Sequence, residues 1–263
     1  MINLISIYLR WRLIFIISMN GLRTRVYIHR KIPYAFNWNE NNHNQKVSQL
    51  FGNQNEIKRL SYFFNKIHHG DIPNNLFNSI DSPRISQFKI KGIKHTFLSS
   101  FSKKLIRQGI VSHLDSQSKL PSYVQNVYST FRKNEIKKIP GHEPVLKNIL
   151  IKDRNSVAIE VPIWKEYEGK FITGHIDLVQ IVNDTIIIAD YKPEGKFLVS
   201  LPQVAAYGLL IKSILNLSKI KCVSFNKKEA WEFDPEILKV EVKEFLEFHS
   251  INERPWEKFI DEI

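Results

Sequence analysis

The chain has 263 residues, of which 43% are hydrophobic and 24% are charged, a composition typical of a globular protein with a sizeable core. Ten glycines and 11 prolines exclude a collagen-like or linker-like chain, and one cysteine excludes a disulfide framework, a Cys-based zinc finger and a four-Cys iron–sulfur cluster. Lys and Arg total 38 against 26 Asp and Glu, a net charge of +12. Residues 1–150 hold 23 basic and 7 acidic residues, whereas residues 151–263 hold 15 and 19. This split favours a basic part that holds a polyanion, although an Ile-, Lys- and Asn-rich proteome would give a similar charge.

The first predicted segment, residues 4–17 (LISIYLRWRLIFII), is apolar but is interrupted by Arg10 and Arg12. A membrane-spanning helix needs roughly 20 apolar residues, and a signal peptide carries its charges before the apolar run. Met19 follows directly and looks like an ordinary protein start. We therefore interpret residues 1–18 as an apolar extension produced by a start placed too early. A peripheral amphipathic anchor is the alternative, and we expect no stable membrane insertion.

Residues 19–94 are expected to form a basic, mostly helical N-terminal region. The Asn- and Gln-rich stretch 36–56 predicts a loop, residues 57–68 a helix, residues 70–84 a loop and residues 88–93 a short strand. Residues 95–114 have helical apolar spacing, and residues 122–139 predict a further helix that ends in a basic run. Trp38, Tyr62 and Phe63 lie in this basic half, and for them we favour core packing over stacking on nucleic-acid bases.

The second half of the chain changes from helical to strand periodicity. Strands are predicted at 156–164, 171–182 and 185–192, with turns at 166–170 and 183–184; a helix at 201–217, strands at 220–225 and 229–233, and a helix at 236–249 follow. The run TIIIAD in the third strand is nearly all apolar, as expected of a strand buried on both faces. This order predicts an α+β fold with a mixed central sheet flanked by helices, and we assign the domain to residues 95–263.

Two carboxylates and a lysine carry the chemical signal. Asp190 and Lys192 are two residues apart in a strand and therefore project to one face, while Tyr191 points away. The tight turn before that strand can bring Asp177 of the preceding strand beside them. Two carboxylates at one point repel unless a divalent cation lies between them, and a neighbouring lysine can orient an attacking water. The alternative is an ordinary pair of strand ends with a surface Asp–Lys ion pair.

Four short motifs in this region resemble the PD-(D/E)XK nuclease superfamily, and specifically its RecB-like branch. They are E-V-P at 160–162, G-x-x-D at 174–177, D-x-K at 190–192 and Q-x-x-x-Y at 203–207. The resemblance covers roughly residues 156–225. It implies a restriction-endonuclease-like core and catalytic residues Asp177, Asp190 and Lys192. It also implies that Asp177, Asp190 and the carbonyl of Tyr191 bind Mg²⁺ or Mn²⁺.

The resemblance further assigns Gln203 and Tyr207 to the active cleft and to DNA binding. Their i, i+4 spacing puts both on one helix face. Gln203 would contact a phosphate or the lysine, and Tyr207 would pack on the backbone or on a base. The alternative is a partly buried tyrosine beside a surface glutamine.

RecB-like nucleases also use a histidine metal ligand in a helical G-x-x-x-H pattern, which residues 109–113 match. We therefore predict His113 as a further metal ligand. The competitor is His142, with Glu143 as an accompanying carboxylate. His175 occupies a variable position of its motif and is expected to point away from the side of Asp177.

The resemblance implies a Mg²⁺- or Mn²⁺-dependent deoxyribonuclease that leaves 5′-phosphate and 3′-hydroxyl ends, in DNA repair, recombination or processing. Cys222 is the single cysteine and is predicted to be a small core residue of a buried strand. The resemblance is therefore to the subtype without an iron–sulfur cluster. The chain has no P-loop, so a helicase motor would belong to a partner repair protein. We expect a cytoplasmic location. The rival interpretation is a catalytically inactive nucleic-acid-binding scaffold with a nuclease fold.

Overall fold

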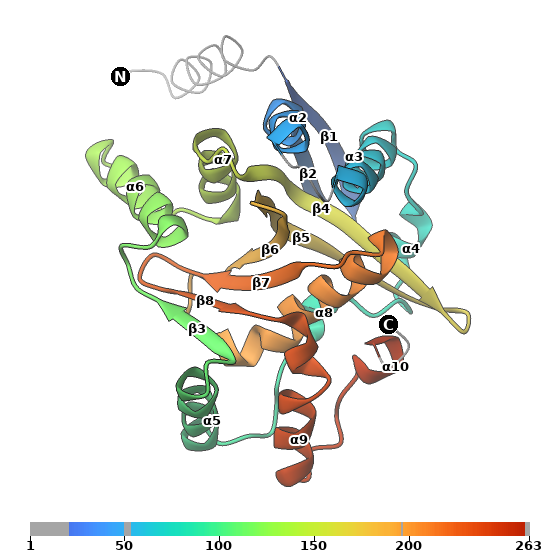
Figure 1. The fold of residues 1–263 in the computed structure, drawn as a ribbon, viewed down its shortest axis with the longest axis vertical. Coiled ribbons are helices and arrows are strands. Elements are labelled where there is room, and N and C mark those ends of the chain that lie inside the picture. The colour runs from blue at the N-terminus through green and yellow to red at the C-terminus, as the bar shows by residue number, and fades with distance from the viewer. Residues whose placement is uncertain (1–20, 50–53, 196, 261–263) are drawn as a thin grey trace.

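A computed structural model describes residues 21–49, 54–195 and 197–260 of the chain. Eight strands form one sheet in the order β1-β2-β4-β5-β6-β7-β8-β3 (Figure 1). The neighbours β6 and β7 are parallel, and the other neighbouring pairs are antiparallel. The predicted α+β class with a mixed sheet flanked by helices is therefore confirmed.

The strands of this sheet have the following bounds. They are β1 (Leu22–His29), β2 (Ile32–Asn39), β3 (Val111–Leu114), β4 (Ser156–Tyr167), β5 (Lys170–Val182), β6 (Thr185–Tyr191), β7 (Ile220–Phe225) and β8 (Ala230–Phe233). Strands β5 and β6 are joined by a tight turn, in which Asn183 has a φ of 55°. Asn tolerates this left-handed conformation better than most residues, which is why the predicted two-residue turn forms here.

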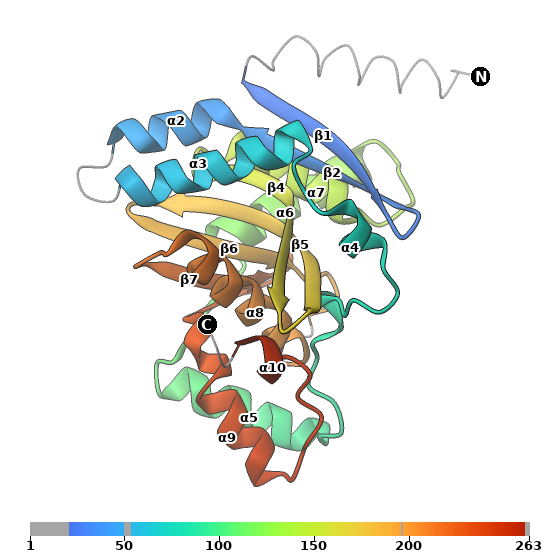
Figure 2. The ribbon, with the colours of Figure 1, turned by 90° about the vertical axis from the view of Figure 1, so that its right-hand side faces the viewer.

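Helices cover both faces of the sheet (Figure 2). One hydrophobic core joins the sheet to α3 (Gln54–His69) and α8 (Phe197–Leu215). A second core lies under α6 (Lys119–Lys133) and α7 (His142–Lys152) on the opposite face. The remaining helices are α2 (Glu40–Gln49), α4 (Asn74–Asn78), η1 (Ile85–Gln87), α5 (His95–Arg107), η2 (Pro235–Leu238), α9 (Glu241–Phe248) and α10 (Glu257–Ile260).

Helix α8 is the crossover that makes β6 and β7 parallel neighbours. It is long and apolar enough to cross a membrane, but 78% of that stretch is buried inside the protein, as in a core helix. Cys222 of β7 lies beneath it, fully buried, and its thiol donates to the carbonyl of Val204 at 3.3 Å. This placement agrees with the small core residue that the sequence predicted.

Several element predictions in the first half are wrong. Residues 36–49 are not a loop, because they complete β2 and form α2; residues 50–53 lie outside the described residues. Residues 88–93 form no strand. The helix at 95–114 ends at Arg107, because Gly109 adopts a φ of 71°. The amide of Gly109 bonds to the carbonyl of Ile106, and that of Ile110 to Leu105, which is the Schellman pattern that closes a helix.

The sheet is continuous across the predicted boundary between residues 94 and 95. Strands β1 and β2 extend it beyond β4, so the basic N-terminal region contributes a hairpin as well as helices. Trp38 and Phe63 are buried in the shared core, whereas Tyr62 is exposed and lies 5.0 Å from the ammonium of Lys66. The segment 1–18 lies outside the described residues.

Candidate functional site

The candidate site lies where β5 and β6 separate. Their pairing runs from Val182↔Thr185 to Leu178↔Ala189 and stops there. Asp177 and Asp190 are the next residue on each strand. Instead of continuing the ladder, a carboxylate oxygen of Asp177 accepts the backbone amide of Tyr191 at 2.9 Å. The end of the pairing therefore holds Asp177 beside the D-x-K segment.

A compact polar group lies where the end of β6 meets α8. It consists of Asp190 and Lys192 together with Gln203 of α8. The ammonium of Lys192 lies 2.5 Å from Oδ2 of Asp190, and it donates to the side-chain oxygen of Gln203 at 3.1 Å. The amide nitrogen of Gln203 approaches Oδ1 of Asp190 at 3.4 Å. Gln203 thus contacts the lysine and holds it beside the carboxylate. Tyr191 points to the opposite core, where its hydroxyl lies 3.3 Å from that of Tyr128.

The pKa values of Asp177 and Asp190 are both raised, although Lys192 acts on each of them. Burial raises the pKa of Asp177 to about 6, against the opposing effects of Lys192 and the Tyr191 amide. Burial and then the charge of Asp177 raise the pKa of Asp190 to about 7, although Lys192 and His142 oppose this. A cation between them would stabilise the charged form of both groups.

Glu160 adds a third carboxylate, which the sequence interpretation did not place in the site. It lies on β4, and burial, followed by the charges of Asp177 and Asp190, raises its pKa to about 8. Its φ of 51° is in the left-handed region, a costly conformation for a glutamate inside a strand. The E-V-P motif was the signal for it, but no role followed from that motif alone.

His142, and not His113, is the histidine that reaches the site. It is the first residue of α7, and its Nε2 lies 3.0 Å from the carbonyl oxygen of Tyr191. The same nitrogen is 3.7 Å from Oδ2 of Asp177. Burial lowers the pKa of His142. A neutral imidazole at this point is able to act as a ligand.

The prediction that His113 lies on a helix beside the carboxylates is wrong. His113 belongs to β3, the edge strand, and is separated from β6 by β8 and β7. Its Nε2 lies 2.8 Å from Oε2 of Glu229, and its ring stacks on Trp231 at 5.8 Å. The glycine of the short motif, Gly109, ends the helix instead of continuing it.

Tyr207 packs behind the site and does not reach a surface where DNA could bind. Its side chain is 2% exposed. A Cβ at Gly174 would lie 2.6 Å from the Tyr207 ring, so only glycine lets the helix approach β5 this closely. The G-x-x-D and Q-x-x-x-Y motifs therefore meet through this contact. The prediction that Tyr207 binds DNA is therefore wrong, because its ring is buried against Gly174 of β5.

His175 faces a different cluster. Its ring stacks on Tyr34 at 3.7 Å, and its Nε2 lies 2.8 Å from Nδ1 of His29. The guanidinium of Arg84 lies 3.4 Å from its other ring nitrogen. These partners come from the N-terminal region, so His175 is engaged away from the carboxylates, as expected.

The donor set suits a hard divalent cation. Within the described ranges, no three or more His, Cys, Asp or Glu side chains form a ready-made metal cage. The site instead combines the buried Asp190 and the partly buried Asp177 with a backbone carbonyl and an imidazole nitrogen. Mg²⁺ is commonly held by one or two carboxylates while it keeps waters and substrate oxygens, so a partial protein cage fits it. Imidazole is also compatible with Mn²⁺ when oxygen ligands dominate.

Comparisons with known proteins add little to this geometry. No known protein family and no curated protein matches the sequence. A solved structure described as "Crystal structure of SSO0001" is similar at 15% identity, over 58% of this chain and 86% of that chain, with a TM-score of 0.25. A likeness this weak carries no argument. The resemblance to RecB-like nucleases therefore remains a prediction.

Proposed function

We propose that this protein is a Mg²⁺- or Mn²⁺-dependent deoxyribonuclease that hydrolyses DNA phosphodiester bonds. The observation that supports it most is the convergence of Asp177 and His142 on the backbone of Tyr191, directly after Asp190, with Lys192 held beside Asp190. A purely structural buried charge would have its own counter-charge. Here one lysine, Lys192, acts on both Asp177 and Asp190, and Glu160 adds a third carboxylate whose pKa their charges raise further after burial.

The ligands of the cation would be Asp177, Asp190, the carbonyl of Tyr191 and His142. We propose His142 in the place first given to His113, because His142 already lies within 3.7 Å of Asp177. When bound, a divalent cation supplies a Lewis acid for the phosphodiester and charge compensation for the carboxylates. Asp177 would remain oriented by the Tyr191 amide throughout.

Lys192 would act on the water and on the charge of the transition state. Its ammonium group has only N–H donors and no free lone pair, so it cannot itself coordinate the metal. Its ammonium is fixed from two sides, by Asp190 and by Gln203. A positioned cation of this kind stabilises developing negative charge without reorganisation. Gln203 is then a positioning residue for Lys192.

The basic half of the chain would hold the DNA backbone without reading its sequence. Such an activity suits DNA repair, recombination or processing in the cytoplasm, together with a helicase or another repair protein as partner. These assignments follow from the proposed chemistry and from the resemblance.

The direct test is incubation of the full chain with end-labelled single-stranded, duplex and flap DNA, with Mn²⁺ and with EDTA. We expect Mn²⁺-dependent cleavage that EDTA abolishes, with 5′-phosphate and 3′-hydroxyl products. Binding of these substrates without any cleavage would instead support the non-catalytic scaffold.

A further inference from the structure

The cleft over the candidate site has a second wall that no motif identified. It has a volume of about 290 Å³, and one side is formed by His142, Tyr191, Lys192 and Gln203. Ser86, within η1, and Lys89, just after it, also line the cleft. Both side chains are exposed. In the sequence, the two residues lie about a hundred positions before the carboxylates.

This wall is held firmly in place. Ile85, Phe88 and Ile90 are buried, so the segment alternates anchoring residues with exposed ones. The amide of Ile90 donates to the carbonyl of Val199 in the first turns of α8 at 3.0 Å. Phe88 packs edge-on against Trp256. Ser86 and Lys89 are therefore presented to the cleft by a fixed backbone.

The two lysines of the cleft differ in their partners. Lys192 is paired with Asp190, whereas Lys89 has no ion pair with any residue in the described part of the chain. The carboxylates below, together with Glu194 on the rim, would repel a strand of phosphates. A lysine in the cleft lining that forms no ion pair offsets that repulsion, and a serine hydroxyl can donate to the same phosphate oxygen.

We propose that Lys89 and Ser86 form a phosphate subsite that binds the nucleic-acid backbone next to the phosphate that is cut. This inference rests on the proposed nuclease function and names how that site holds its substrate. Lys89 lines the same cleft as the D-x-K segment but forms no ion pair with its carboxylates, so we assign it to a neighbouring phosphate and give it no part in the chemical step. Its loss weakens binding and leaves the turnover of bound substrate intact.

The test compares Lys89→Ala with Lys91→Ala, which removes the same charge from an exposed position two residues away that does not line the cleft. Binding of a labelled single-stranded oligonucleotide is measured in EDTA over a range of KCl. We expect Lys89→Ala to weaken binding about tenfold and to reduce the slope of log K against log salt by about 0.7–0.9, the share of one phosphate contact. Lys89→Arg should restore both values, and Lys91→Ala should change them little.

With Mn²⁺, Lys89→Ala should raise KM about tenfold and leave kcat within about twofold of wild type. Equal binding and equal salt slopes for the Lys89 and Lys91 variants would overturn the subsite, as would a wild-type chain that binds no oligonucleotide. If wild type binds DNA but never cleaves it with Mn²⁺, the nuclease proposal fails. The binding comparison in EDTA still decides the subsite in that case.

Discussion

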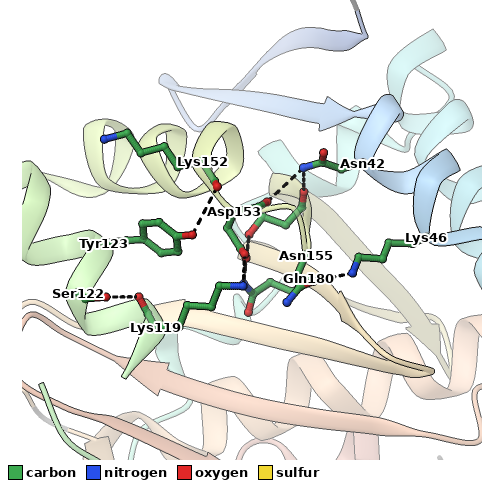
Figure 3. A network of polar contacts seen from close by, with 10 residues as sticks. Asn42, Lys46, Lys119, Ser122, Tyr123, Lys152, Asp153, Asn155 and Gln180 are labelled. Carbon is green, nitrogen blue, oxygen red and sulfur yellow. Dashed lines mark hydrogen bonds and ion pairs between the residues drawn. The ribbon is translucent and has the colours of Figure 1, made fainter. Parts of the chain in front are cut away.

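Two buried aspartates, Asp153 and Asp190, each lie beside a lysine, but Asp190 also has the carboxylate of Asp177 near it. Asp153 is fully buried and has a partner for each carboxylate oxygen (Figure 3). Lys119 lies 2.6 Å from Oδ1, while Ser156 and Gln180 donate to Oδ2 at 2.8 and 2.6 Å. One negative charge is matched by one lysine and two polar donors, which is the usual state of a buried structural charge.

Asp190 has one lysine, which also acts on Asp177. Burial raises the pKa of both groups, to about 7 for Asp190 and about 6 for Asp177, and the charge of Asp177 adds to the effect at Asp190. Gln180 and Asp177 are only three residues apart in β5. Gln180 donates to the carboxylate of Asp153, which is paired with a lysine, whereas Asp177 belongs to the group of carboxylates at the candidate site. Buried negative charge without its own partners marks a place built to receive a cation.

The largest expected effect is the loss of cleavage when Asp190 is replaced, which would distinguish Asp190 from the structural Asp153. Asp190→Ala should abolish cleavage while leaving DNA binding nearly intact, because the carboxylate serves the metal and the basic half holds the backbone. Cleavage of end-labelled DNA and a binding titration measure the two properties. A variant that still cuts at roughly a tenth of the wild-type rate or better would remove Asp190 from the catalytic set, since the loss of a central electrostatic group costs about 10²–10³ or more.

Lys192→Met should lower the single-turnover cleavage rate by about 10²–10³ while Mn²⁺ still binds. The reason is that Lys192 lies beside the carboxylates without being a ligand. Single-turnover kinetics and calorimetric titration of Mn²⁺ check the two halves of this prediction. If metal affinity collapses in the variant, Lys192 maintains the structure of the site and its catalytic role has to be withdrawn.

Asp153→Ala should have its effect on stability and not on chemistry. It leaves the buried Ser156 hydroxyl without its acceptor and removes the nearer of the two acceptors of the Gln180 amide, at a cost of about 2–4 kcal/mol in the free energy of unfolding. Urea unfolding measures this value. The folded fraction should still cleave DNA, and loss of cleavage in fully folded protein would show that the two networks are not independent.

The smallest of these effects concerns the two histidines. His142→Ala should weaken Mn²⁺ binding by roughly 10–100-fold, the range seen when groups that support a metal are removed. His113→Ala is the matched control, because His113 pairs with Glu229 at the far edge of the sheet. Mn²⁺ titrations of both variants show which of the two histidines contributes to metal binding. A loss of affinity in the His113 variant alone would restore the sequence-based assignment.

Much of the second half was predictable because its signals are local. Strand alternation, the Asn183 turn and the apolar run before Asp190 are properties of neighbouring residues, and strand β7 has the predicted bounds. The hairpin of β1 and β2 was missed because it is stabilised by pairing with β4, more than a hundred residues away. An Asn- and Gln-rich composition does not show such pairing.

The candidate site was predictable to a similar extent. Asp177, Asp190, Lys192 and Gln203 meet as strand and helix geometry suggested. His142 and Glu160 could not be placed, because the first depends on how α7 packs and the second on a left-handed residue inside a strand. Lys89 reaches the cleft only through the anchoring of its segment to α8.

The central claim is that the negative charge of Asp177, Asp190 and Glu160 is not fully compensated by nearby positive groups. The pH dependence of the protein's stability tests this claim most directly. Carboxyl groups with raised pKa values bind more protons in the folded than in the unfolded protein, so their contribution to stability is lost as pH rises from about 4 to about 8. Buried His43 and His175, whose pKa values are lowered by burial, act in the opposite direction. The difference between wild type and Asp190→Asn therefore isolates the carboxylates.

The measurement is the free energy of unfolding of both proteins in EDTA and in Mn²⁺ between pH 5 and pH 8. In EDTA, we expect wild type to lose stability relative to Asp190→Asn as the pH rises, and Mn²⁺ to reverse that loss in wild type only. Parallel curves in EDTA, or equal stabilisation of both proteins by Mn²⁺, would contradict a carboxylate cluster built to hold a divalent cation.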